Sequence, residues 1–180
     1  VDMKRVVVNL VVFKAAWTAV VLSAAAGIPL LGAIAVAVAI GIHLWSSENA
    51  EAEARLLLVA AFIGLAWESW LVQAGLLQYT SGNLVPGLAP YWIVAMWVLF
   101  ATLLNTGMRW LRRSKVVAAI AGGIGGPMAF VAGASVGAVE FVSPVLALIA
   151  IGVGWAALLP LLVQIALRLD GGDRPVQQSA

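Results

Sequence analysis

The sequence predicts an all-α polytopic membrane protein, a bundle of about six transmembrane helices with both termini cytoplasmic. Of its 180 residues, 63% are hydrophobic and only 10% are charged, and the mean hydropathy is +1.06. Apolar runs of roughly 20 residues, the length that crosses a bilayer, recur along the chain with short connections. The basic residues collect in connections that share one side of such a bundle.

Breaker residues divide the chain into six expected helices, at 6–26, 28–45, 56–77, 90–111, 116–139 and 143–167. Gly27 can stop the first helix and Pro29 can start the second, so these two should form a tight antiparallel hairpin. We therefore expect one transmembrane helical domain over residues 1–180. Within it, residues 1–5 form a short cytoplasmic segment and the polar residues 170–180 form a disordered tail.

The distribution of basic residues orients these spans. Nine of the ten lie on one side of the six helices, namely Lys4, Arg5, Arg55, Arg109, Arg112, Arg113, Lys115, Arg168 and Arg174. The positive-inside rule places that side in the cytoplasm, and it explains "RWLRRSK" as a topology signal touching anionic lipid. We expect membrane lipids as partners and no nucleic acid. Ala15 and Ala19 offer a small-residue face on which a protein partner in the membrane could dock.

An acidic residue, Glu68, stands between two tryptophans in the third expected helix, and the tenth basic residue, Lys14, lies inside the first. Gly64 and Gly75 share the helix face of Glu68, which indicates that this face packs inward. Counted from the cytoplasmic side, the two charges differ in depth by about 6 Å. Because a charge at the bilayer centre costs ~2.5–3.5 kcal/mol, we expect an ion pair. The pair is either an inert lock of helix register or a substrate or proton site, and we adopt the second interpretation.

Other polar groups fall at comparable cytoplasmic or central depth: Asn9, Thr18, His43, Asn105, Arg109 and Gln164. They could form one inward-opening polar pocket with the ion pair. His43 could instead cap the end of its helix. The chain has no cysteine and a single histidine, which excludes disulfides, iron–sulfur ligation and a multi-histidine cage, so we expect no metal and no cofactor.

A glycine-rich stretch, "AGGIGGPMAFVAGASVGA", supports two readings. Gly122, Gly126, Gly133 and Gly137 lie along one helix face and permit tight packing. Alternatively, Pro127 breaks the helix inside the membrane. The half-helix that follows would then present its positive dipole end to an anionic head group or to Glu68.

Four segments, "NLVVFKAAW", "WESWLVQAGLL", "APYWIVAMWVLFATLLNTGMRWL" and "GGIGGPMAFVAGASVGA", resemble an uncharacterised bacterial inner-membrane family, domain of unknown function 2878, over about residues 9–140. The matching positions are Asn9, Phe13, Trp17, Glu68, Gly75, Pro90, Trp92, Trp97, Gly126 and Pro127. Where this chain has Glu68 the family more often has Asp, and where it has Lys14 the family more often has Gln. The resemblance implies a bacterial cytoplasmic-membrane protein without established activity, whose relatives often lie beside genes for fatty-acid modification.

Three functions remain open. The first is binding or transport of a lipid or small amphiphile in a polar pocket around Glu68 and Lys14. The second is a non-catalytic accessory or assembly role in the membrane. The third is lipid modification, with Glu68 as acid or base and Lys14 or Arg109 contacting an anionic head group. The sequence lacks H-E-x-x-H and has too few histidines for an intramembrane desaturase, so we lean against an enzyme.

Overall fold

The computed structural model describes residues 3–170 and contains six α-helices, one 3-10 helix and a two-stranded ribbon. In chain order these are α1 (Met3–Ala25), α2 (Pro29–Trp45), α3 (Ala50–Gln73), β1 (Leu77–Tyr79), α4 (Tyr91–Ala101), η1 (Arg109–Arg113), α5 (Lys115–Ser135), β2 (Val139–Phe141) and α6 (Pro144–Leu169). Apart from Asp170, the expected disordered tail lies outside the described residues. The prediction of a helical bundle is confirmed, with the small ribbon as an addition.

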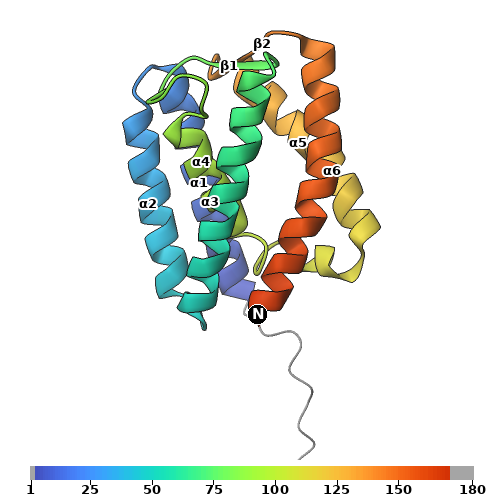
Figure 1. The fold of residues 1–180 in the computed structure, drawn as a ribbon. Helices are drawn as coiled ribbons and strands as arrows, with labels where there is room; N and C mark the ends of the chain where they lie inside the picture. Colours follow the sequence, from blue (N-terminus) through green and yellow to red (C-terminus); the bar gives the residue numbers. More distant parts are fainter. Residues whose placement is uncertain (1–2, 171–180) are drawn as a thin grey trace, which may run out of the picture.

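The helices run up and down between two ends of the bundle (Figure 1). The ribbon closes one end, and α1 begins and α6 finishes at the other. We call the second end the basic end, because eight of the described basic residues lie there, in the terminal turns of helices or in η1: Lys4, Arg5, Arg55, Arg109, Arg112, Arg113, Lys115 and Arg168. Lys14 is the exception, as expected.

Four of the helices, α1, α3, α5 and α6, are long and apolar enough to cross a membrane, while α2 and α4 are shorter apolar helices. The third helix begins at Ala50, six residues before the expected start at 56. The Asn49 side chain caps it by accepting a hydrogen bond from the Ala52 backbone N–H at 3.1 Å. Its first turn contains Glu51 and Glu53, whose negative charges stabilise the helix by interacting with the positive end of the helix dipole.

The fourth expected helix, 90–111, is wrong in its second half. The helix α4 ends at Ala101, residues 102–108 form successive turns, and η1 follows. The hydroxyl of Thr102 donates to the Leu99 carbonyl at 2.7 Å. That of Thr106 shares its one hydrogen between the Thr102 carbonyl, at 2.9 Å, and Asn9 Oδ1, at 2.7 Å. Such side-chain bonds compete with helical ones. We call residues 102–113 the strap.

Helices α3 and α5 end alike, each at a glycine with a left-handed backbone. Gly75 has φ 66° and Gly137 has φ 85°. In both cases the following backbone N–H bonds back to the carbonyl five residues earlier, at 3.0 Å, which closes a Schellman turn. The chain then enters β1 and β2, which pair antiparallel. The expected spans to 77 and 139 therefore each continued about one turn too far.

Helix α5 is continuous through Pro127, so the alternative in which this proline breaks the helix is wrong. The structure supports the tight-packing interpretation of the glycines. The proline leaves the Gly123 carbonyl without its helical donor. That carbonyl instead faces Gly152 of α6, where an added Cβ would lie 3.3 Å from Gly123 O and 3.5 Å from Pro127 Cγ. Close contact with a glycine therefore covers the defect. Gly137 lies in the turn after the helix and takes no part in this packing.

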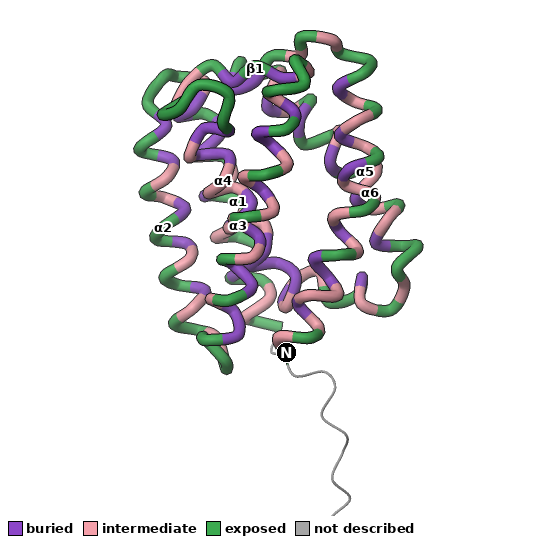
Figure 2. Tube along the Cα trace, in the orientation of Figure 1, coloured by how far each residue is buried: buried purple, intermediate pink, exposed green. Residues whose placement is uncertain are grey.

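Exposed positions recur along the outer faces of the helices (Figure 2), and many of them hold large apolar side chains. On α5, large exposed side chains recur every fourth residue, at Val116, Ile120, Ile124 and Met128. Exposed leucines, isoleucines and valines likewise cover α2 and α6. Helices that are apolar outside as well as inside suit a lipid surrounding.

Candidate functional site

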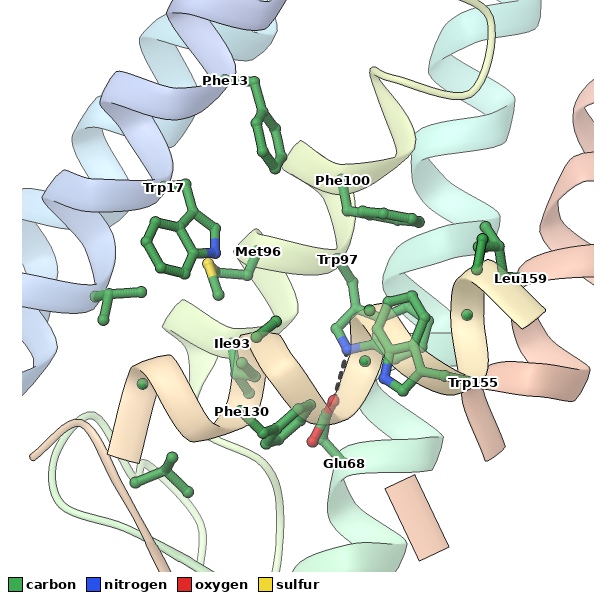
Figure 3. A pocket seen from close by; sticks show the side chains of 18 of the residues that line it. Phe13, Trp17, Glu68, Ile93, Met96, Trp97, Phe100, Phe130, Trp155 and Leu159 are labelled. Atoms are coloured by element: carbon green, nitrogen blue, oxygen red, sulfur yellow. Dashed lines mark hydrogen bonds between the residues drawn. The ribbon is translucent and has the colours of Figure 1, made fainter. Parts of the chain in front are cut away.

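A cavity of about 310 Å³ lies inside the bundle (Figure 3), with walls from α1, α4, α5 and α6. Six of its aromatic wall residues are labelled in Figure 3, namely Phe13, Trp17, Trp97, Phe100, Phe130 and Trp155, and Tyr79, Trp92 and Trp110 also line it. On α5 the lining runs from Ala121 to Gly133, about 18 Å at ~1.5 Å per residue. The strap closes the basic end through Met108 and Leu111, and Tyr79 closes the ribbon end. The cavity is therefore long, aromatic and almost wholly apolar.

Glu68 reaches this cavity from α3 and has no exposed surface. Its Oε2 accepts a hydrogen bond from the Tyr79 hydroxyl at 2.6 Å, and its Oε1 accepts one from the Trp97 indole N–H at 2.8 Å. Figure 3 shows the second bond, with the carboxyl group directed at the indole nitrogen. Each oxygen thus has a neutral donor, which offsets the cost of burying the group. The inward position predicted for Glu68 is confirmed.

The ribbon positions Tyr79. Alternation along β1 turns Leu77 and Tyr79 inward and Gln78 outward. The Tyr79 ring also meets Trp92 edge to face, with centroids 5.4 Å apart. Burial, together with the neighbouring Glu68, raises the pKa of the Tyr79 hydroxyl well above its usual value of 10. The Tyr79 hydroxyl therefore keeps its proton and donates a hydrogen bond to Glu68.

Glycines seat the two indoles beside Glu68. A Cβ at Gly64 would lie 2.3 Å from Trp97 Cγ, and a Cβ at Gly126 would lie 2.5 Å from Trp155 Cγ. The two rings stack with centroids 4.6 Å apart. Gly122 packs against the Trp155 backbone in the same way, whereas Gly133 leaves ordinary contact distance to Val139. The predicted glycine face thus serves to place Trp155 against Trp97.

The expected ion pair between Lys14 and Glu68 is wrong. Within residues 3–170 the ion pairs are Arg5–Glu48, His43–Glu53, Arg55–Glu51 and Arg112–Asp170. Lys14 lines the cavity but is exposed, and its Nζ lies over the Trp17 ring, 5.2 Å from the centroid. The depth estimate failed because α3 starts at Ala50, which puts Glu68 about 27 Å along its helix and Lys14 only about 16 Å along α1, at ~1.5 Å per residue.

A second polar group, the basic-end cluster, holds several of the other predicted pocket residues. Asn9 on α1 contacts His43 Nδ1 on α2 at 3.1 Å, and His43 Nε2 contacts Glu53 Oε2 on α3 at 3.1 Å. Glu53 Oε1 accepts from Asn105 Nδ2 at 2.8 Å, and Asn9 Oδ1 accepts from the Thr106 hydroxyl at 2.7 Å. The cluster joins three helices to the strap. His43 is therefore an interior link and not the exposed helix cap considered above, since it is 4% exposed.

The predicted pocket is thus divided in two. Asn9, His43 and Asn105 belong to the basic-end cluster, and Glu68 and Lys14 line the cavity. Arg109 belongs to neither, because it is exposed at the start of η1. Arg112, one turn later, occupies the position in the polar cluster that was expected for Arg109. It donates to Asn105 and, at 3.1 Å, to Asp170. Thr18 is exposed and Gln164 half-buried, and neither lines the cavity.

The chemistry available in the cavity is limited. Its titratable lining groups among the described residues are Lys14, Glu68 and Tyr79. Residues 3–170 contain no group of three or more histidine, cysteine or acidic side chains that could hold a metal ion. The arrangement suits binding of an apolar molecule with few polar contacts.

Comparison with models of protein families shows to which family the chain belongs. The family model for DUF2878, protein of unknown function, matches residues 6–161. This chain belongs to the DUF2878 family. Searches among curated proteins and among solved structures found no match. The region matched by DUF2878 contains the whole cavity lining and all of the basic-end cluster except its Asp170 contact.

Sequence reasoning missed Tyr79, Glu53, Arg112 and Trp155 in this DUF2878 chain. A signal existed for Glu53, because Asn49 followed by acidic residues is an N-cap pattern that predicts helix at 50. For Tyr79 the signal was Gly75, which can end a helix, followed by a short run in which apolar and polar residues alternate, as in a strand. For Arg112 and Trp155 the sequence contains no signal, because nothing distinguishes them from the other arginines and tryptophans of the chain.

The DUF2878 chain also contains Gly133-Ala134-Ser135-Val136-Gly137, which fits the nucleophile pattern G-x-S-x-G. That pattern needs a sharp strand-to-helix turn and a histidine base. Here Ser135 is the last residue of α5, is exposed, and donates to the Ala132 carbonyl at 2.8 Å. His43 is engaged in the basic-end cluster. The match is therefore not a nucleophile elbow.

Proposed function

We propose that this DUF2878 protein is a multi-pass protein of the bacterial cytoplasmic membrane that binds a lipid or small amphiphile in the aromatic cavity beside Glu68 and Lys14. The observation that carries the proposal is the cavity itself. Its volume of about 310 Å³ lies in the range of small-molecule sites, and its wall is aromatic and apolar with few polar groups.

The apolar exterior supports the membrane location. Four helices have the length and composition to cross a bilayer, and large apolar side chains cover their outer faces. We infer that α2 and α4 cross as well, which gives six crossings. The basic end then faces the cytoplasm by the positive-inside rule.

The mouth of the cavity supports entry of a ligand from the bilayer. Among the lining residues, Lys14 on α1, Gly125 and Ala129 on α5 and Trp110 of the strap are exposed. Three of these four lie on α1 and α5, so we place the opening on the side of the bundle, between two helices that would face lipid. A molecule dissolved in the bilayer could enter there without crossing water.

The polar groups favour binding over catalysis. Both oxygens of Glu68 accept hydrogen bonds from Tyr79 and Trp97, so the carboxyl is held in place by neutral donors. The indole N–H of Trp155 is buried and has no partner among the described residues. An unpaired buried donor costs ~1–3 kcal/mol, which an acceptor on a bound ligand would relieve.

The test is native mass spectrometry with lipid identification on protein taken from its own membrane. We expect wild type to retain a specific lipid or amphiphile. Ala129→Phe should lose it, because the larger side chain fills the mouth. Met128→Phe is the matched control, since Met128 is 66% exposed on the same helix and is not part of the lining. Retention by all three proteins, or by none, contradicts a ligand in this cavity.

A further inference from the structure

We propose that the bound amphiphile is anionic, with its charged head beside Lys14 and its apolar body against the aromatic wall toward Glu68. This inference rests on the amphiphile site proposed above and specifies the chemical class of its ligand. It makes Lys14 the residue that determines specificity.

Lys14 is the basic residue of the cavity. The other described basic residues lie at the basic end, and none of their side chains is part of the lining. No acidic side chain pairs with Lys14 within residues 3–170. An ammonium group about 16 Å along a membrane-spanning helix therefore lacks a counter-ion from the protein itself.

The direction of the Lys14 side chain argues against simple escape toward water. A lysine in a membrane helix can extend its stem to the nearest interface, which here would be the basic end. The Lys14 ammonium instead lies over the ring of Trp17, one turn farther from that end. Contact with an aromatic face offsets only part of the cost of the charge. The ammonium is thus held at the cavity, where an anionic group can meet it.

Glu68 sets the orientation of the ligand. Figure 3 shows Phe13 and Trp17, which flank Lys14 on α1, across the cavity from Glu68. A negative head beside Lys14 stays away from the carboxyl, whose oxygens are occupied by Tyr79 and Trp97. The space between is lined by rings and by small residues of α5, which suits a single hydrocarbon chain or ring system.

The experiment uses four probes that share one tail and differ in the head: dodecanoate, dodecyl phosphate, dodecanol and dodecylammonium. Each is titrated into the full chain in nanodiscs of zwitterionic lipid, and bound probe is counted by native mass spectrometry. The proteins are wild type, Lys14→Gln, Lys14→Arg and a control, Lys115→Gln, which removes an exposed charge at the basic end.

For Lys14→Gln we expect about tenfold or more weaker binding of the two anionic probes, as for loss of a hydrogen bond to a charged group. Dodecanol should bind it as it binds wild type, which also shows that the variant is folded. Lys14→Arg and Lys115→Gln should keep anion binding. A difference between the carboxylate and the phosphate names the preferred head.

Two results overturn the inference. If Lys14→Gln binds all probes as wild type does, or loses dodecanol as much as the anions, Lys14 does not select charge, while the cavity remains an amphiphile site. If wild type binds none of the four probes, the proposed function fails together with the inference.

Discussion

The hydrogen bond from Tyr79 to Glu68 gives a sharp test of how the buried carboxyl is held. Tyr79→Phe removes one oxygen atom from a ring that is 4% exposed and leaves the rest of its packing in place. Glu68 Oε2 then loses its donor at 2.6 Å. Leaving a buried acceptor without a partner costs ~1–3 kcal/mol, so we expect the free energy of unfolding to fall by about that amount.

Part of that loss should depend on the carboxyl, which a double-mutant cycle with Glu68→Gln isolates. Unfolding is followed by circular dichroism in mixed micelles with increasing denaturing detergent. We expect a coupling energy of ~1–2 kcal/mol, which exceeds the ~0.6 kcal/mol average for hydrogen bonds between membrane helices because this bond is fully buried.

The control for this cycle is Tyr91→Phe, at the start of α4. Its ring is half-buried, and we expect a change within ~0.5 kcal/mol. A coupling energy near zero, with Tyr79→Phe no worse than the control, would refute the view that Tyr79 holds Glu68 in place through this hydrogen bond.

Two further predictions concern the glycine face and the basic-end cluster. Gly126→Ala should lower the free energy of unfolding by ~1–3 kcal/mol, because the added Cβ would lie 2.5 Å from Trp155 Cγ. Gly125→Ala is the control, and it should be neutral or stabilising because an added Cβ would meet nothing within 4 Å. Equal changes in the thermal unfolding of the two variants would contradict this prediction. Glu53→Gln should cost ~1–3 kcal/mol, because an amide can accept only one of the two hydrogen bonds that its oxygens now receive from neighbouring elements. The control is Glu51→Gln, at an exposed position. If unfolding in denaturing detergent gives the same free energy for the two variants, the prediction for Glu53 is refuted.

Composition and periodicity were enough to predict most of the fold. Apolar runs longer than a bilayer crossing have few stable alternatives to a helix, because a backbone in lipid must satisfy its own hydrogen bonds. The helical class follows from this requirement. The hairpin at Gly27 follows from the glycine and proline at the turn, and the gathering of basic residues at one end follows from the positive-inside rule. Helix ends were harder to predict, as α4 shows: it ends at Ala101 although the following residues remain largely apolar, and Thr102 in the next turn bonds the Leu99 carbonyl through its hydroxyl.

The sequence by itself determined that Glu68 had to be buried and compensated, since a carboxyl between tryptophans inside a span has no other stable place. Which groups compensate it was decided only by tertiary structure. Tyr79 arrives from a ribbon made by two distant helix ends, and Trp97 fits there because Gly64 leaves room. Lys14 matched Glu68 in depth only when counted from the expected helix starts, and the true start of α3 at Ala50 removes that match. Depth along a helix also does not specify which face or which neighbour a side chain meets. That choice depends on how six helices pack, which no single segment encodes.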